Sequence, residues 1–241
     1  MNNCLVAIHA HIFYEDIINE ITNKTNNIPV KFDLYITTDK EQKMEFIKNF
    51  TDKYSKARNV IITVLENKGR DILPFLTQMG LVIDKYKYLC HLHSKKSPYV
   101  PGLGEGWRTY LYNNLLGTTE IISEILSDFE NDDKLGFIFP ENYHQIVEHA
   151  MLLYKKTKKN MNYLLKILFH RYKISDKYIE FPAGDMFWAR TKAIYQIFKI
   201  DLRHNVPKEK GSKSILFAIE RIWLFIVKIN GYYYKKYINY Y

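Results

Sequence analysis

Short apolar runs alternate with longer amphipathic segments through the first half of the chain. The runs are rich in β-branched and aromatic residues and end in polar or turn residues, which predicts strands. These strands are expected at Leu5–Ile12, Phe32–Thr37, Asn59–Leu65 and Tyr88–His93. Segments of helical length separate them, at Glu15–Thr22, Lys40–Tyr54 and Ile72–Tyr86. This β-α-β-α order predicts an α/β fold with a mostly parallel sheet flanked by helices.

The second half of the chain is less regular and predicts a helical C-terminal part. Prolines and glycines crowd Ser97–Gly106, which predicts a long loop of the kind that carries active-site residues. Helices are expected at Trp107–Leu116, Thr119–Phe129, His144–Tyr154, Met161–Tyr172, Lys192–Phe198 and Ser214–Lys228. A strand is expected at Leu135–Phe139, and a strand–turn–strand unit at Phe181–Arg190. The aromatic tail, Tyr232–Tyr241, fits either a docked terminal strand or a frayed end.

The composition is that of a packed globular protein. With 47% hydrophobic and 15% aromatic residues among 241, the chain has ample material for a core, which excludes the disordered and fibrous classes. This length predicts one domain. The most apolar stretch, Ile215–Ile229, contains Glu220, Arg221 and Lys228 and is shorter than the about 20 apolar residues that span a bilayer. It therefore predicts a buried or surface-lying helix.

Charge and cysteine content indicate which kinds of partner and which redox environment suit the protein. A formal charge of +9 attracts polyanions such as nucleic acid, anionic lipid headgroups or sugar-nucleotide diphosphates, although a solvated, lysine-rich surface gives the same excess. Cys4 and Cys90 lie inside apolar runs without metal-ligand spacing, which is typical of inert thiols in a reducing, cytoplasmic protein. The sequence starts in an apolar run and shows no signal-peptide pattern.

Polar residues gather where the predicted strands end. Parallel α/β sheets bind ligands beyond the carboxyl ends of their strands, so these residues are the first candidates for a site. At the ends of the first two strands they are His9, His11, Thr38 and Asp39. The sequence contains no P-loop, no G-x-G-x-x-G fingerprint, no G-x-S-x-G elbow and no zinc signature.

The segment Glu66–Asp71, after the third strand, has the composition of a ligand-binding turn. Gly69 permits a tight turn, and Arg70 offers a forked cation for phosphate or carboxylate. Asp71 either caps the following helix or accepts hydrogen bonds from a ribose or base. The spacing alone leaves both roles of Asp71 open.

Two histidines and two lysines end the fourth strand. His91 and His93 alternate along the strand, so both side chains point to the same face and can bind a metal, although no third ligand is visible. Lys95 and Lys96 offer ammonium groups for a diphosphate. Histidine is more often a structural residue than a ligand, but the four together indicate function.

Two carboxylates of the second half are candidates for acid–base chemistry. Asp185 lies in the Phe181–Arg190 unit, where it can bond hydroxyls or act as a base, and either Trp188 or Phe187 can stack on a sugar ring. Glu220 precedes Arg221 in an apolar helix. A buried glutamate there acquires a raised pKa suited to a general base, but an ion pair or an exposed polar face fits the same pattern.

Seven segments of the chain resemble, in order, segments of the rhamnan synthesis protein F family. They are VAIHAHIFY at Val6–Tyr14, FDLYITTD at Phe32–Asp39, ENKGRD at Glu66–Asp71, CHLHSKKS at Cys90–Ser97, GLGEGWRTYL at Gly102–Leu111, PAGDMFWAR at Pro182–Arg190 and AIERI at Ala218–Ile222. Any one is unspecific, but together they cover nearly the whole chain. The resemblance implies a GT-A-like glycosyltransferase with a Rossmann-type sheet that acts in cell-surface polysaccharide assembly.

The resemblance further implies a nucleotide-sugar donor, dTDP-rhamnose, and a lipid-linked glycan acceptor at a peripheral contact with the cytoplasmic membrane face. Residues 1–100 would be the nucleotide-sugar-binding half of a single domain, 1–241, and residues 101–241 the acceptor-side half with the C-terminal helices. The donor-binding residues expected are His9, His11, Thr38, Asp39, Asn67, Gly69, Arg70, Asp71, His91, His93, Lys95 and Lys96. Those expected on the acceptor side are Trp107, Arg108 and Trp188.

One departure from the GT-A pattern concerns the metal. GT-A enzymes usually carry an Asp-x-Asp motif after the fourth strand, where this chain has His91-Leu92-His93. We expect metal-independent transfer, in which the histidines with Lys95 and Lys96 stabilise the leaving diphosphate. If a metal is used, His91 and His93 are the expected ligands, and they favour a transition metal over Mg²⁺.

The expected chemistry is inversion by direct displacement, with a carboxylate as base. Asp185 is the first candidate and Glu220 the second, because Asp185 lies in a turn rather than inside a helix. A rival hypothesis is a non-catalytic module that binds the sugar or nucleotide sugar within a larger assembly protein. Nucleic-acid binding is disfavoured, because the lysines are scattered rather than gathered in one stripe with aromatics.

Overall fold

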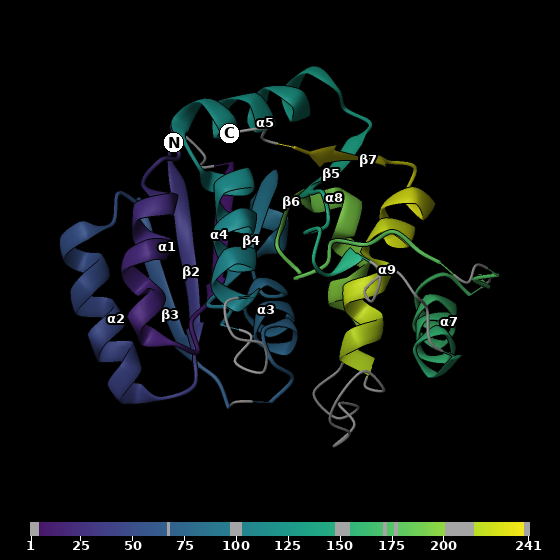
Figure 1. Ribbon diagram of the computed structural model, residues 1–241, viewed down its shortest axis with the longest axis horizontal. Coiled ribbons are helices and arrows are strands. Elements are labelled where there is room, and N and C mark those ends of the chain that lie inside the picture. The colour runs from purple at the N-terminus through teal and green to yellow at the C-terminus, as the bar shows by residue number, and fades with distance from the viewer. Residues whose placement is uncertain are drawn as a thin grey trace.

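A seven-stranded sheet with helices on both faces forms the protein (Figure 1). The computed structural model describes residues 5–66, 68–96, 103–147, 155–170, 173–175, 178–200 and 215–238. The strands are β1 (Val6–His11), β2 (Phe32–Thr38), β3 (Asn59–Val64), β4 (Tyr88–His93), β5 (Leu135–Pro140), β6 (Phe187–Arg190) and β7 (Tyr233–Tyr237). Their order across the sheet is β3-β2-β1-β4-β6-β5-β7.

The sheet is mostly parallel, as the alternation of strands and helices predicts. Strand β1 pairs in parallel with β2 and β4, β2 with β3, and β5 with β7, whereas β6 runs antiparallel to both β4 and β5. The chain leaves β1 toward β2 and β3 on one side and later places β4 on the other side. The strand order therefore reverses between β1 and β4, which is where open α/β sheets bind ligands.

Helices cover the two faces in separate groups. Those that share a core with one face are α1 (Ile18–Thr25), α2 (Glu41–Tyr54), α4 (Leu103–Leu116) and α5 (Thr119–Asn131). Those that share a core with the other are α3 (Ile72–Met79), α7 (Lys155–Phe169), α8 (Thr191–Ile194) and α9 (Ile215–Ile229). Short 3₁₀ turns lie at Glu15–Ile17, Ile83–Lys85 and Tyr195–Lys199. In Figure 1, α1 and α2 flank the purple and blue strands, and α7 and α9 lie toward β5 and β7.

Because side chains alternate along a strand, the same strands contribute residues to both cores. In β1, Ile8 and Ala10 join the core under α1, α4 and α5, whereas Ala7 joins the core under α3 and α9. Each large apolar side chain so buried contributes roughly 1.5–3 kcal/mol. Helix α5 shows how sequence sets the elements: Thr118 caps it by accepting the Ile121 N–H, and apolar residues recur every three or four positions toward the sheet.

Most predicted elements are confirmed, and the differences have physical causes. The strands lie within two residues of their predicted bounds, and the tail is a docked strand, β7. The predicted helix Ile72–Tyr86 is wrong in extent: it ends at Met79 before Gly80, and a 3₁₀ turn follows. The helix predicted from Lys192 is a short α-helix that continues as a 3₁₀ turn.

Three further predictions concern less regular segments. The strand–turn–strand unit predicted at Phe181–Arg190 is half right, because a turn precedes β6 but residues 181–186 form no strand before it. The last four residues of the loop predicted at Ser97–Gly106 belong to α4, which begins at Leu103. The first six residues of that predicted loop lie outside the described part of the chain. Most of the helix predicted at His144–Tyr154 also lies outside it.

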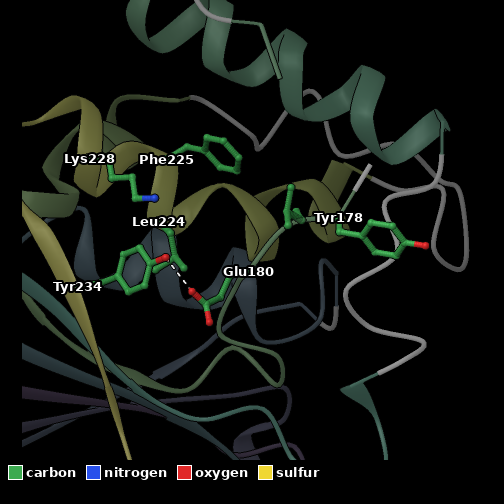
Figure 2. A pocket seen from close by; sticks show the side chains of 7 residues that line it. Tyr178, Glu180, Leu224, Phe225, Lys228 and Tyr234 are labelled. Carbon is green, nitrogen blue, oxygen red and sulfur yellow. Dashed lines mark hydrogen bonds between the residues drawn. The ribbon is translucent and has the colours of Figure 1, made fainter. Parts of the chain in front are cut away.

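A small pocket of about 150 Å³ opens between α9, β7 and the segment before β6 (Figure 2). Leu224, Phe225 and Lys228 of α9 line one side, and Glu180 and Tyr234 line the other. Figure 2 shows the hydrogen bond that joins the Tyr234 hydroxyl to the Glu180 carboxylate, at 2.7 Å.

Candidate active site

Four histidines lie side by side where the strand order reverses. The parallel register of β1 and β4 places His9 opposite His91 and His11 opposite His93. Because side chains alternate along a strand, all four project from the same face of the sheet, which we call the histidine face. His9 Nδ1 and His91 Nδ1 are 2.9 Å apart, and His11 Nδ1 is 2.9 Å from the Thr37 hydroxyl.

Burial lowers the pKa of every imidazole of the histidine face. It lowers the pKa of His9 and His91 well below the usual 6.5, and nearby imidazoles lower both pKa values further. Burial also lowers the pKa of His11 to about 4, although Asp71 opposes the shift. The pKa of His93 is lowered by burial as well. Because burial disfavours the charged form of these rings, the hypothesis that they stabilise a leaving diphosphate stays a prediction.

The turn before α3 brings Asp71 to the histidine face. Gly69 and Arg70 both have positive φ, at 78° and 58°, and a Cβ on Gly69 would lie 2.3 Å from Leu73 Cβ. Asp71 occupies the N-cap position of α3, but its side chain makes no capping hydrogen bond. Its carboxylate lies 3.8 Å from His93 Nε2 instead. The capping hydrogen bond is therefore not made, and contact of Asp71 with a ligand stays a prediction.

A second strained turn brings Asp185 to the same place. Gly184 and Asp185 have φ of 96° and 54°, a conformation that costs energy in a non-glycine residue and is typical of functional sites. A Cβ on Gly184 would lie 2.8 Å from Leu111 and 3.2 Å from Trp107. The turn is held through Gly184: its carbonyl accepts from His93 Nε2 at 2.7 Å, and its N–H donates to Glu220 at 3.1 Å.

Asp71 and Asp185 have opposite ionisation tendencies. Asp185 is 2% exposed, and burial raises its pKa well above the usual value, as do the negative charges of Asp71 and Glu220. Burial would raise the pKa of Asp71 too, but His93 and His11 outweigh it and lower that pKa. Neighbouring carboxyl groups with pKa values pushed apart are typical of acid–base pairs. Trp223 Nε1 donates to Asp185 Oδ1 at 2.7 Å and fixes its orientation.

The positive charge of the site comes from Lys95 and two arginines. Lys95 Nζ lies 3.8 Å from the centre of the Trp107 ring. Burial lowers the pKa of Lys95, and the nearby carboxylates of Glu220 and Asp71 oppose this. The Arg70 guanidinium lies 4.8 Å from the centre of the Phe217 ring of α9, and Arg221 pairs with Glu220 at 3.1 Å. Lys95 lies close enough to Asp71, Asp185 and Glu220 to interact with their carboxylates electrostatically.

Lys96 does not belong to this group. Its ammonium pairs with Asp16 and lies 4.8 Å from the centre of the Tyr14 ring. Consecutive residues leaving a strand diverge, so Lys95 turns into the site and Lys96 turns away from it. The expectation that both lysines face a diphosphate is therefore wrong for Lys96 in this conformation.

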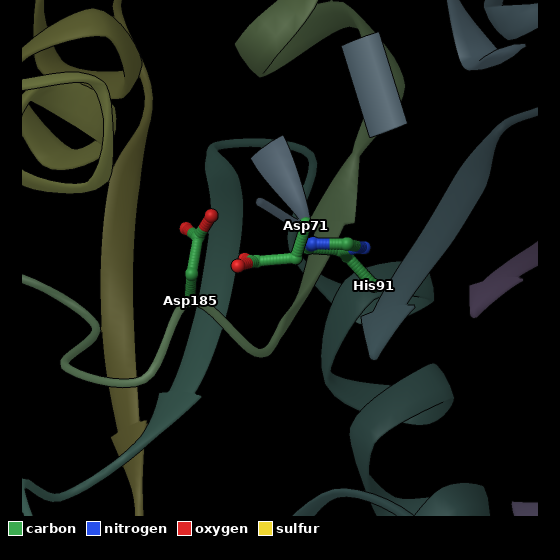
Figure 3. A group of neighbouring side chains, drawn as sticks. All are labelled: Asp71, His91 and Asp185. Atoms are coloured by element: carbon green, nitrogen blue, oxygen red, sulfur yellow. The ribbon is translucent and has the colours of Figure 1, made fainter. Parts of the chain in front are cut away.

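Asp71, His91 and Asp185 together offer a place for a metal ion. One ligand atom from each lies within 4.8 Å of the others, and Figure 3 shows the Asp71 carboxylate directed toward Asp185 beside the His91 ring. His91 Nε2 and Asp185 Oδ2 are buried without a hydrogen-bond partner among the described residues. Two carboxylates and a neutral imidazole are suitable ligands for Mn²⁺ or Zn²⁺, so the residues fit a cation.

This group differs from the metal ligands expected from the sequence. His91 is shared by both, but His93 donates its Nε2 hydrogen to the Gly184 carbonyl and is engaged there. The two other ligands, Asp71 and Asp185, were not expected to bind a metal, and they come from turns that are distant in the chain. We therefore replace the pair His91 and His93 by Asp71, His91 and Asp185 as the candidate ligands.

Three other expected residues support the site from outside it. The Thr38 hydroxyl donates to the Ile12 carbonyl at 2.9 Å, and Asp39 pairs with Lys43 at 2.6 Å. Arg108 donates to the Lys95 carbonyl and to Glu20, both at 2.9 Å, so it holds the backbone of Lys95. Asn67 lies outside the described residues.

The two tryptophans expected on the acceptor side have different positions. Trp188 is 0% exposed in the core under α4 and α5, and its Nε1 donates to the Leu115 carbonyl at 2.9 Å. Its expected contact with an acceptor is therefore wrong. The alternation of β6 turns Phe187 to the histidine face instead, 5.6 Å from the His91 ring. Trp107 lies against Gly184 and Lys95 at the site.

Two functional residues escaped sequence reasoning. Trp223 fixes Asp185, and the Phe75 ring of α3 stacks on His91 with 4.1 Å between ring centres. Trp223 follows Glu220 by three positions, so both lie on one face of α9. A buried indole N–H needs an acceptor, and that requirement was the signal that could have identified Trp223. The helical stripe of α3 gave no comparable signal for Phe75.

A family model described as "Rhamnan synthesis protein F" matches residues 1–232. Two proteins of Xanthomonas campestris, both described as "Uncharacterized protein WxcX", are 26% identical over 220 residues, which is 89% of this chain and 30% of theirs. The chain thus spans about a third of the length of these curated relatives.

Among solved structures, the fold is similar to "S. aureus TarS 1-349". The TM-score is 0.46 and the sequence identity 12%, over 96% of this chain and 59% of that one. Within the part of the chain that the structure describes, every helix is too short or too polar to cross a membrane.

Proposed function

Since the chain belongs to the rhamnan synthesis protein F family, we propose that it is a glycosyltransferase of polysaccharide assembly. It moves a sugar from a nucleotide-sugar donor to a glycan acceptor. The observation that carries this proposal is the convergence of Asp71, Asp185 and Lys95 at the point where the strand order reverses. That is where such sheets bind nucleotides, and the group combines cations for a diphosphate with a carboxylate for a base.

On the donor side, Lys95 and Arg70 bind the diphosphate. Both are cationic side chains near the carboxylates, and Trp107 and Phe217 limit where they move. Such prearranged charge stabilises the negative charge that develops on the leaving nucleoside diphosphate. The donor that the family suggests is dTDP-rhamnose, and residues 1–100 supply most of its contacts.

On the acceptor side, Asp185 is the general base. Its carboxylate takes the proton of the acceptor hydroxyl while that oxygen attacks the anomeric carbon. The bond from this carbon to the diphosphate oxygen breaks, and the configuration inverts. A raised pKa makes Asp185 a stronger base than an ordinary aspartate. Glu220 binds Gly184 N–H and Arg221, which makes it a positioning residue.

A divalent cation, if bound, would be held by Asp71, His91 and Asp185 and would add positive charge for the diphosphate. The expectation of metal-free transfer predicts unchanged turnover in EDTA. Loss of turnover in EDTA that Mn²⁺ restores would contradict it. Isothermal titration calorimetry of the purified protein with Mn²⁺ tests the metal site, because the heat of binding is measured without any turnover.

The acceptor proposed is a lipid-linked glycan at the cytoplasmic face of the membrane. The charge of +9 suits contact with anionic lipid headgroups. Residues 101–241 supply the acceptor side of the site. Trp107 lies where the acceptor side meets the donor side.

The deciding experiment offers the purified chain dTDP-rhamnose and other nucleotide sugars, with and without rhamnose-containing acceptors. We expect release of nucleoside diphosphate and a glycosylated product. Asp185→Asn should lower kcat by about 10²–10⁴-fold, Glu220→Gln should lower it less, and Asp52→Asn on the exposed face of α2 should leave it unchanged. Near-normal kcat in Asp185→Asn contradicts the base assignment.

The rival hypothesis, a non-catalytic binding module, gains support from the histidines in place of the usual Asp-x-Asp motif. It predicts donor binding without release of nucleoside diphosphate under any of these conditions. Calorimetry beside the activity assay therefore separates the two functions.

A further inference from the structure

The pocket between α9, β7 and the segment before β6 is connected to the candidate active site by two stretches of chain. Glu220, Leu224 and Lys228 recur every four residues on α9, so they lie along one face of the helix. Glu220 contacts the Asp185 turn, whereas Leu224 and Lys228 line the pocket. By helical rise, Leu224 lies about 6 Å and Lys228 about 12 Å along the axis from Glu220.

The second connection is the segment that leads into β6. Glu180 lines the pocket, and four residues later Gly184 begins the turn that presents Asp185. Between the two places, the Arg221 guanidinium lies 4.3 Å from the centre of the Phe181 ring. The pocket and the site are therefore neighbours along both stretches.

The lining of the pocket suits a sugar ring. Phe225, Tyr234 and Leu224 provide apolar walls, and Glu180 and Lys228 provide polar groups at the rim (Figure 2). Tyr234 and Lys236 orient the Glu180 carboxylate at 2.7 and 2.9 Å, and each of its oxygens keeps a further lone pair for a hydroxyl. Aromatic walls with a few fixed polar groups are typical of sites for small polar ligands.

The size of the pocket argues for part of a longer ligand. Its volume of about 150 Å³ is below the ~300–1,000 Å³ of complete ligand sites. It holds one ring, not a nucleotide sugar. A polymeric acceptor is longer than one ring, so a chain whose end reacts at Asp185 extends over neighbouring surface.

We propose that this pocket is an acceptor subsite that binds one sugar ring of the glycan, away from the reacting end. This inference rests on the proposed function and deepens it, because it makes an oligosaccharide rather than a single sugar the preferred acceptor. Lys228 and Glu180 bond ring hydroxyls, and Phe225 and Tyr234 contact the apolar face of the ring.

The test uses calorimetry with rhamnose and with a linear rhamnose tetrasaccharide. We expect the wild-type chain to bind the tetrasaccharide more tightly than the monosaccharide. Lys228→Met should weaken tetrasaccharide binding about three- to tenfold, the usual effect of one lost hydrogen bond. Monosaccharide binding should not change. The matched control is Lys235→Met, because Lys235 pairs with Asp128 and does not line the pocket.

Phe225→Ala provides a second variant, and thermal unfolding of each variant confirms that it folds. Equal tetrasaccharide affinity in wild type and Lys228→Met overturns the inference, as does an absence of length dependence in the wild type. Donor turnover distinguishes this failure from failure of the proposed function. If the wild-type chain releases nucleoside diphosphate but binds acceptors of different length equally well, only the subsite is refuted. If it never releases nucleoside diphosphate, the transferase assignment is refuted.

Discussion

The two faces of the strand pair β1–β4 are equally buried but chemically unlike. One is apolar and consists of Ile8, Ala10, Cys90 and Leu92. The other is the histidine face, with two candidate carboxylates beside it. Burial of the apolar face stabilises the fold, whereas burial of imidazoles and carboxyl groups costs hydration free energy. The comparison teaches that one pair of strands divides stability and chemistry between its faces, so substitutions on the two faces should separate the two properties.

Among substitutions of single cations and apolar residues on the two faces, the largest effect is expected at the cationic end of the histidine face. Lys95→Met removes an ammonium that stabilises the leaving diphosphate, so kcat should fall about 10²–10³-fold while the melting temperature stays within a few degrees. Lys96→Met is the matched control, because its ammonium pairs with Asp16 outside the site. Steady-state kinetics measure both variants. Equal losses of kcat in Lys95→Met and Lys96→Met would contradict the different roles given to these two lysines.

On the apolar face, Leu92→Ala should act on stability alone. It leaves a cavity in a packed core, so we expect the free energy of unfolding to fall by about 2–5 kcal/mol. At a temperature where the variant is folded, kcat should stay near the wild-type value. Urea unfolding provides the measurement, and Leu81→Ala, at a position that is 79% exposed, should cost less than about 0.5 kcal/mol. A large loss of kcat in folded Leu92→Ala would contradict the separation of stability and chemistry between the two faces.

The histidine face should make the fold sensitive to acid. The folded-state pKa of His11, about 4, lies below its unfolded value of 6.5, so the unfolded chain takes up the proton first as the pH falls. Stability is therefore complete above pH 6.5 and decreases between pH 6.5 and 4, by on the order of 3 kcal/mol for this group. His11→Gln should flatten the dependence, measured by urea unfolding at several pH values. His144→Gln, at an exposed position, should not.

The smallest effect is a gain in stability at Asp185. Its pKa is raised in the folded state, so above the unfolded value of 3.8 the unfolded chain releases the proton first and folding is disfavoured. Asp185→Asn removes this penalty and keeps a carbonyl oxygen for Trp223. We expect the melting temperature to rise by a few degrees while turnover is lost. A lower melting temperature would show that the ionised carboxylate stabilises the fold.

The sequence predicted the sheet well, because apolar alternation and strand-end polarity are local signals. It placed His9, His11, His91 and His93 at strand ends and put the last two on a common face. It did not show that His9 lies opposite His91, since register depends on pairing between strands that are distant in the chain. It also could not tell which of Phe187 and Trp188 faces the site, and it placed Trp188 on the acceptor side although Phe187 lies on the histidine face.

Side-chain direction outside regular elements was the other limit. Nothing local distinguishes Lys95 from Lys96, and only the position of Asp16 separates their roles. The choice between cap and ligand at Asp71 likewise depended on the left-handed turn that precedes it. The metal group escaped prediction because its members come from three elements that are joined only in the folded chain.

The position of β6 has a consequence for synthesis of the chain on the ribosome. This strand lies between β4 and β5 although it follows both in the chain. Strand β4 ends at His93 and β6 begins at Phe187, so at about 5–20 residues per second roughly 5–20 s pass before the gap is filled. Through that interval the edge of β4 that β6 later covers stays unpaired, and an unpaired strand edge promotes association with other chains.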